Sequence, residues 1–306
     1  MKYRIFLGLL IVSLIFTSCS GPAVNEEEKL DIDSFSENLS DEEFDMELDK
    51  EAIGEIIQNI SSPVEMSALL KDEGIEFNYK YLSSTDNVDE FNTSFKQALN
   101  LGVLGADMGY LNMYNKTGAV LNYITAIKEL SDELKVGQFF NFETLKRLAT
   151  NNENLDSLMY ISISAFDKMD TYLRENNRSN ISALLVTGVW IEGAFLASQV
   201  VLENDNLAIR DRVAEQGIIM EQLMLVLNHY KKDPQFFKLI TELNKLQVLL
   251  NKVEIIEEEG EAEMMEVDGV LMAVSNTKTT INMSDELLDD IIKEIESLRT
   301  YIISYN

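Results

Sequence analysis

Apolar residues recur at helical spacing through most of the chain, and one stretch departs from that pattern. From Asn180 to Val201 the sequence is apolar on every side, with a single charge, Glu192, close to the only tryptophan, Trp190. A helix without a polar face must be covered on all sides. We therefore predict that this stretch forms the central helix, surrounded by amphipathic helices from about Val88 to Leu250.

The other expected helices share a 3.6-residue repeat of apolar positions and are separated by short polar or glycine-containing turns. Including the central one, the helices span about 51–60, 64–71, 88–114, 117–134, 141–150, 154–174, 180–202, 207–230, 234–253 and 285–302. Short connections favour antiparallel neighbours. The predicted fold class is all-α, an antiparallel multi-helix bundle.

Polar residues suited to N-caps precede several of these helices. Asp86 or Asn87 precedes the helix at 88–114, and Asn141 opens the next short one. Asp233 comes directly before a proline, which is favoured in the first helical turn, and Ser284 precedes the last helix. These side chains are expected to bond the free backbone N–H groups at the helix starts.

Two segments lack the helical pattern. Residues 75–85 carry alternating aromatic side chains and are expected to form a short strand or an extended segment on the bundle. Around 254–283, Val270–Val274 and Thr279–Met283 have β-branched character, and Asp268-Gly269 is a turn signal. A small β-hairpin near 254–283 is expected, with a long irregular loop as the alternative.

The N-terminus has the parts of a secretory signal. Lys2 and Arg4 make a positive start, and Ile5–Phe16 is an apolar run too short to span a bilayer comfortably. Residues 1–18 are therefore predicted to be a signal peptide.

The end of this signal resembles the lipobox of bacterial lipoproteins, in which small residues precede a lipidated cysteine. Thr17, Ser18 and Cys19 match that pattern, whereas Phe16 stands where leucine is usual. Cys19 is also the only cysteine in the chain. The resemblance implies lipidation at Cys19. An ordinary secretory signal and an N-terminal membrane anchor are the alternatives.

The segment after the cysteine is polar and acidic. Residues 19–49 combine low hydrophobicity with a run of acidic residues, which predicts a disordered tether, and residues 50–306 hold the helical bundle domain. A lipid-anchored chain of this kind is expected in the bacterial cell envelope, at the outer membrane, either facing the periplasm or exposed at the surface.

The charge balance excludes one class of partner. The chain has 25 Lys and Arg against 53 Asp and Glu, a net charge of −28. Such a surface repels phosphate backbones, so no nucleic-acid partner is expected. The membrane, through the N-terminal lipid, and a partner protein are the expected contacts.

No catalytic motif is present in the sequence. The chain has one histidine, His229, and lacks a Gly-x-Ser-x-Gly elbow, a phosphate-binding glycine loop and a dinucleotide fingerprint. We predict a non-enzymatic protein with no cofactor and no metal site. The acidic run at Glu257–Glu266 has no ligand spacing and is interpreted as a solvated loop.

Two carboxylates in apolar helices are the candidates for a ligand site. Asp107 and Glu192 sit in similar short sequences, each with an aromatic residue three positions further on. A buried carboxylate is costly unless it is paired, and its pKa is expected to rise. One hypothesis places Asp107, Tyr110, Trp190 and Glu192 around a cationic or hydroxyl-rich ligand.

The alternative for these carboxylates is purely structural. Gly105-x-x-x-Gly109 would then allow tight helix packing, and each carboxylate would bond a tyrosine, an amide or Arg178 inside the bundle. A third interpretation, a membrane span at 180–201, is disfavoured by Glu192 at its middle. Substitution of Glu192 by Gln is expected to leave a structural bundle folded and to abolish binding of a cationic ligand.

The sequence thus favours a lipid-anchored scaffold or partner-protein module. Small-molecule binding or sensing near Asp107 and Glu192 is the alternative function.

Overall fold

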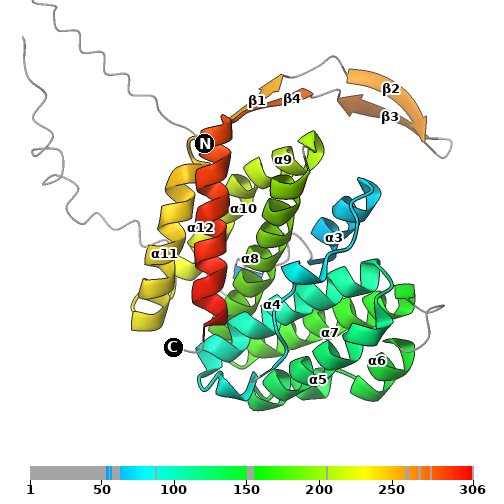
Figure 1. Cartoon of the computed structure of the whole chain (residues 1–306), viewed down its shortest axis with the longest axis vertical. Helices are drawn as coiled ribbons and strands as arrows, with labels where there is room; N and C mark the ends of the chain where they lie inside the picture. The colour runs from blue at the N-terminus through cyan, green and yellow to red at the C-terminus, as the bar shows by residue number, and fades with distance from the viewer. Residues whose placement is uncertain are drawn as a thin grey trace, which may run out of the picture. The chain divides into compact units, whose positions relative to one another are not determined.

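The computed structural model of the chain describes residues 53–54, 56, 63–86, 88–149, 155–204, 206–258, 262–267, 270–275 and 278–304. Its helices are α3 (Pro63–Asp72), α4 (Ser94–Met113), α5 (Thr117–Glu133), α6 (Phe142–Ala149), α7 (Leu155–Glu175), α8 (Ser179–Glu203), α9 (Leu207–Ala214), α10 (Gln216–Asn228), α11 (Pro234–Leu250) and α12 (Asp285–Ile303). The predicted all-α bundle is confirmed (Figure 1). The predicted signal peptide, Cys19 and the tether lie outside the described residues.

Helix α8 is the central helix, as its uniformly apolar sequence predicts. It packs against α3, α4, α7, α9, α10 and α12, and most of its side chains are buried. Its length and mean hydropathy of 1.6 would suit a membrane span, yet 94% of its most apolar window is buried inside the protein. Neighbouring helices therefore provide the cover that a helix without a polar face requires.

Helices α4 and α8 make the most extensive helix contact, and two glycines allow it. A Cβ at Gly188 would lie 1.9 Å from the Leu99 carbonyl oxygen, and one at Gly102 would lie 2.1 Å from the Leu185 oxygen. The two backbones thus touch at this crossing. The sequence had suggested Gly105 for this role, but a Cβ at Gly105 would face the Phe166 ring of α7 at 3.1 Å.

Helices α11 and α12 lie side by side, and α12 also packs along α8 (Figure 1). The apolar stripe of α12, including Ile291, Ile295 and Ile302, is buried. Gln199 of α8 bonds Glu296 of α12 at 2.7 Å, whereas Glu192 bonds the later residue Arg299. Because the contacts run in opposite directions along the two helices, α8 and α12 are antiparallel.

The β-hairpin predicted near 254–283 is confirmed, with a different pairing of its strands. Strand β1 (Glu254–Glu258) pairs with β4 (Lys278–Asn282), and β2 (Ala262–Val267) pairs with β3 (Val270–Ser275), both antiparallel. The two β-branched segments therefore pair with the acidic segments before them and not with each other. Because β3 and β4 contain no acidic residue, this pairing avoids like charges across the ladder. The predicted Asp268-Gly269 turn lies outside the described residues.

Two boundaries differ from the sequence-based expectation. The helix expected from Val88 begins at Ser94, because the Thr93 side chain caps it by accepting from Lys96 N; a short 3₁₀-helix occupies Val88–Glu90. The helix expected over 207–230 is divided at Glu215 into α9 and α10. Residues 75–85 are extended, as expected, around a 3₁₀ turn at Tyr79–Tyr81.

Three predicted N-caps are confirmed. Asn141 Oδ1 accepts from Thr144 N at 3.0 Å, and Ser284 Oγ accepts from Leu287 N at 3.2 Å. Asp233 Oδ1 accepts from Gln235 N at 2.8 Å, with the proline at the first turn of α11. Side-chain oxygens at these positions satisfy N–H groups that the helices cannot bond internally.

Candidate functional site

The centre of the bundle contains a buried ion pair between α8 and α12. Arg299 Nε donates to Glu192 Oε2 at 2.7 Å, and Arg299 Nη2 donates to Glu192 Oε1 at 2.8 Å. Glu192 is fully buried, and the Arg299 side chain is 11% exposed. The guanidinium carbon also lies 4.0 Å from the centre of the Phe195 ring. This two-bond geometry is the strongest form of carboxylate recognition by arginine.

The extended segment before α4 completes the shell around this pair. Arg299 Nη2 also donates to the Tyr81 carbonyl oxygen at 3.1 Å and to Ser83 Oγ at 2.6 Å. The Tyr123 hydroxyl donates to the Ser83 carbonyl oxygen at 2.5 Å. Polar contacts to α5 and α12 thus hold the 75–85 segment in place. The sequence predicts either a short strand or an extended segment here.

Asp107 joins the same network from α4. Its Oδ2 accepts from Ser83 N at 2.9 Å, while Oδ1 completes no regular hydrogen bond among the described residues, and the residue is fully buried. Burial, together with the nearby Glu192 carboxylate, raises the pKa of Asp107 well above its usual range. A neutral Asp107 can donate a hydrogen bond to Glu192, so the network then holds one negative and one positive charge.

The structure brings together two of the four residues expected at a ligand site. Asp107 and Glu192 interact, as their positions in α4 and α8 suggested. Tyr110 turns toward the 75–85 segment, where its hydroxyl accepts from Asn78 N at 3.1 Å and its ring stacks on Phe77. Trp190 Nε1 donates to Gln216 Oε1 at 2.9 Å, on the side of α10. In these contacts, neither the Tyr110 hydroxyl nor Trp190 Nε1 bonds to Asp107 or Glu192.

The sequence analysis did not predict Arg299 as the partner of Glu192. The position of Arg299 in α12 nevertheless carries a signal for this role. In α12 the buried residues Ile295, Leu298 and Ile302 define the inner face, and Arg299 falls within their helical repeat. A base at an inward position requires a buried acid. Arg178, the partner suggested from sequence, instead donates to the Leu134 carbonyl oxygen at 2.9 Å.

A site for an external cation at Glu192 is already filled by the protein itself. Both carboxylate oxygens of Glu192 accept hydrogen bonds from the Arg299 guanidinium. Arg299 Nη2 also donates to Ser83 Oγ and to the Tyr81 carbonyl oxygen. This arrangement can hold α8, α12 and the 75–85 segment together. Both Glu192 oxygens are bonded to Arg299, whereas Asp107 Oδ1 completes no regular hydrogen bond among the described residues.

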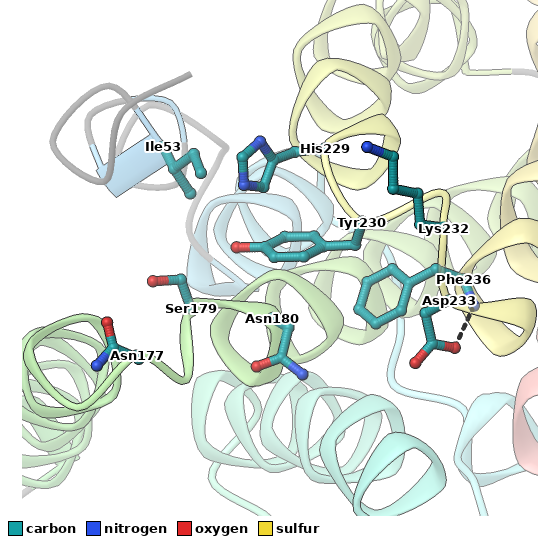
Figure 2. A pocket seen from close by; sticks show the side chains of 9 residues that line it. All are labelled: Ile53, Asn177, Ser179, Asn180, His229, Tyr230, Lys232, Asp233 and Phe236. Atoms are coloured by element: carbon teal, nitrogen blue, oxygen red, sulfur yellow. Dashed lines mark hydrogen bonds between the residues drawn. The ribbon is translucent and has the colours of Figure 1, made fainter. Parts of the chain in front are cut away.

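A separate cleft lies at the start of α8 (Figure 2). It has a volume of about 500 Å³, and its lining includes Ile53, Ser179, His229, Tyr230, Lys232 and Phe236. These residues come from the first turn of α8, the connection between α10 and α11, the first turn of α11 and the N-terminal helical segment.

Two hydroxyl groups in this cleft lack partners within the described structure. Ser179 Oγ and the Tyr230 hydroxyl are buried and complete no regular hydrogen bond, although the two groups are close enough to interact. Burial raises the pKa of Tyr230 above its usual value, so its hydroxyl stays protonated and can donate. In Figure 2 the Tyr230 ring crosses the cleft with its hydroxyl directed toward the side of Ser179 and Ile53.

Metal ligation has no support in the part of the chain that the structure describes. No group of three or more His, Cys, Asp or Glu side chains there is placed to hold a metal ion.

Comparison with known proteins gives a short partial similarity. Argininosuccinate lyase of Prochlorococcus marinus strain MIT 9215 is 34% identical over 100 residues, and those of strains AS9601 and MIT 9301 are 32% and 31% identical. The similarity covers 32% of this chain and 21% of each relative, so the chain spans about a fifth of their length. No protein-family model matches, and no solved structure matches. The similarity is too short to define a family.

Proposed function

We propose that this chain is a lipid-anchored, non-enzymatic protein of the bacterial cell envelope that binds a partner protein. The lipobox-like end of its signal, with Cys19 as the only cysteine, and the acidic segment that follows support anchoring at the outer membrane on a flexible tether. Both the periplasmic face and the cell surface fit this proposal.

Exposed apolar side chains on the α10–α11 hairpin carry the proposal of a protein partner. Ile218 and Leu225 of α10 and Phe237 and Val248 of α11 are all exposed, Phe237 to 62%. Single exposed apolar residues are ordinary, but several on one pair of packed helices are typical of a surface that another protein covers. In a chain of net charge −28, such residues favour contact with an apolar protein surface.

The experiment is a pull-down of the full-length protein from native membranes, compared with Cys19→Ala. A stoichiometric partner that is lost or reduced with Cys19→Ala is the expected result, because lipidation places the surface beside its partner. The paired change Leu225→Glu and Phe237→Glu should abolish the interaction.

Tyr160→Glu, which alters an exposed aromatic residue on α7, serves as the control and should retain the partner. A protein recovered alone from membranes contradicts the proposal. A partner that is retained after the Leu225 and Phe237 changes contradicts the assignment of the surface.

Small-molecule binding is the second candidate function, and the cleft at the start of α8 favours it. Ser179 and Tyr230 present unpartnered hydroxyls there, whereas Glu192 lies about 20 Å further along the helix. The cleft is therefore a second candidate ligand site beside the region of Asp107 and Glu192 that the sequence suggested.

A further inference from the structure

The cleft at the start of α8 combines a helix N-terminus with buried donors. Helix α8 is 25 residues long, and its N-cap residue, Arg178, makes no side-chain capping bond. Ser179 and Asn180, in the first turn, line the cleft. The first N–H groups of a helix lack internal partners and carry a partial positive charge, which favours an anion.

An unpartnered buried hydroxyl provides the second, independent observation. Ser179 is only 6% exposed, and its Oγ completes no regular hydrogen bond within the described part of the chain. The Tyr230 hydroxyl, on the opposite element, completes none there either, although it is close enough to Ser179 to interact. Buried polar groups are rarely left unsatisfied in folded proteins, since each one costs free energy. Both hydroxyls line the same cleft, so one bound group with acceptor oxygens would satisfy them together.

The charges around the cleft suit an anionic group. Lys232 and His229 lie at its rim, on the connection between α10 and α11. The nearby carboxylate of Asp233 is engaged with backbone N–H groups of α11, from Gln235 and Phe236. The formal charges of Lys232 and Asp233 therefore balance, the Asp233 carboxylate is directed to the start of α11, and the N-terminus of α8 supplies the local preference for an anion.

The rest of the lining is apolar. Ile53 and the rings of Tyr230 and Phe236 face the cleft (Figure 2). A volume of about 500 Å³ matches the size of sites for small organic ligands. An apolar ligand body would bury its surface against these three side chains.

We propose that this cleft binds a small organic anion, with a carboxylate or phosphate group at the N-terminus of α8 and an apolar body against Ile53, Tyr230 and Phe236. The inference rests on small-molecule binding as the second candidate function and adds the chemical class of the ligand. Ser179 and Tyr230 donate to the anionic group, and Lys232 supplies charge at the rim.

The test uses His229, the only histidine, as a probe inside the cleft. The full-length chain in detergent, with labelled histidine and a purification tag that contains none, gives imidazole NMR signals from one residue. Benzoate, its neutral counterpart benzyl alcohol, and inorganic phosphate are titrated separately. Benzoate should shift the His229 signals with saturation, and benzyl alcohol should bind at least about tenfold more weakly because it lacks the charge.

Variants identify the groups that bind the anion. Ser179→Ala and Lys232→Gln should each weaken benzoate binding, Ser179→Ala by about tenfold through the lost hydrogen bond to a charged group. Ser179→Ala should leave the melting temperature nearly unchanged, because the Ser179 hydroxyl completes no regular hydrogen bond within the described residues. Lys252→Gln, which removes an exposed lysine after the other end of α11, is the matched control and should bind as the unmodified protein does.

Four results would overturn the proposal in distinct ways. Equal binding of benzyl alcohol and benzoate would retain small-molecule binding and remove the anionic class. A response to neither benzoate nor phosphate nor benzyl alcohol would remove both the class and the binding function of the cleft. Unchanged benzoate affinity in Ser179→Ala and Lys232→Gln would show that the anion binds elsewhere. Binding of inorganic phosphate alone would limit the site to an inorganic anion and overturn the apolar part of the ligand.

Discussion

Arg299 and Glu192 form a two-bond ion pair that joins the last helix of the chain to its central helix. Glu192 is completely buried, and the pair is surrounded by backbone and side-chain groups of residues 81–83. Buried pairs of this kind are expensive to desolvate, but they become strongly destabilising only when one partner is removed. Replacing only Glu192 or only Arg299 is therefore expected to destabilise the protein.

Glu192→Gln is expected to destabilise the protein by about 3–5 kcal/mol, because it leaves the Arg299 charge buried without a counter-charge. The expectation drawn from sequence was only that a structural bundle stays folded, and the ion pair adds this loss of stability to it. Chemical denaturation of the full chain measures the change. Glu221→Gln, an exposed site on α10, is the control and should change stability by less than about 0.5 kcal/mol.

The double change Glu192→Leu with Arg299→Met should recover much of that loss, because apolar residues of similar size can replace a buried pair. If Glu192→Gln alone is as stable as the unmodified protein, the ion pair has no structural role.

Asp107→Asn tests the protonation of the buried network. The folded-state pKa of Asp107 is raised above its ordinary value of 3.8 by burial and by Glu192. The folded protein thus retains a proton that the unfolded chain releases, so this group's contribution to stability falls as pH rises from about 4 through the raised pKa. Asparagine imitates the neutral acid and cannot ionise.

The expected result is that Asp107→Asn gains stability relative to the unmodified protein as pH rises, and that the difference closes near pH 4. Denaturation of both proteins at several pH values measures this difference, in which titrating groups far from Asp107 cancel. A difference that stays constant with pH would show that Asp107 is charged in the folded state.

The cap of α12 supports the helix that holds Arg299. Ser284 Oγ accepts from Leu287 N at 3.2 Å. Ser284→Ala should cost about 1 kcal/mol, whereas Ser284→Asp should preserve the cap and its stability. Thermal unfolding of both variants measures the effect, and equal losses in the two would indicate that the side-chain bond contributes nothing.

The parts of this fold that follow from sequence are those with one dominant physical cause. The burial of α8 could be predicted because a helix that is apolar on every side must be covered by the rest of the protein. The N-cap at Asp233 could be predicted because an acid directly before proline is typical of a helix start. The start of α4 was missed because Val88 continues the apolar pattern, while the cap at Thr93 gives no stronger signal than Asp86.

The candidate site was harder to predict because it depends on contacts between distant residues. Asp107 and Glu192 are identifiable as buried acids, but their partner Arg299 is 107 residues from Glu192. The only sequence signal for Arg299 is its position within the apolar stripe of α12. The cleft at Ser179 has no sequence signal, since it exists where α8, α11 and the α10–α11 connection meet.

The crossing of α4 and α8 gives a prediction that sequence periodicity could not supply. A Cβ at Gly188 would lie 1.9 Å from the Leu99 carbonyl oxygen, far inside contact distance, and the obstacle is backbone that cannot turn away. Gly188→Ala should therefore push the helices apart and cost about 1–3 kcal/mol or more. Gly193→Ala on the same helix is the control, because its Cβ would meet Met66 Cβ at an ordinary 3.7 Å.

The control should be neutral or gain up to about 1 kcal/mol, since alanine favours a helix over glycine. Chemical denaturation of the two variants side by side measures the contrast. Similar stability of Gly188→Ala and Gly193→Ala would mean that α4 and α8 do not touch through their backbones, and the central packing of the bundle would have to be revised.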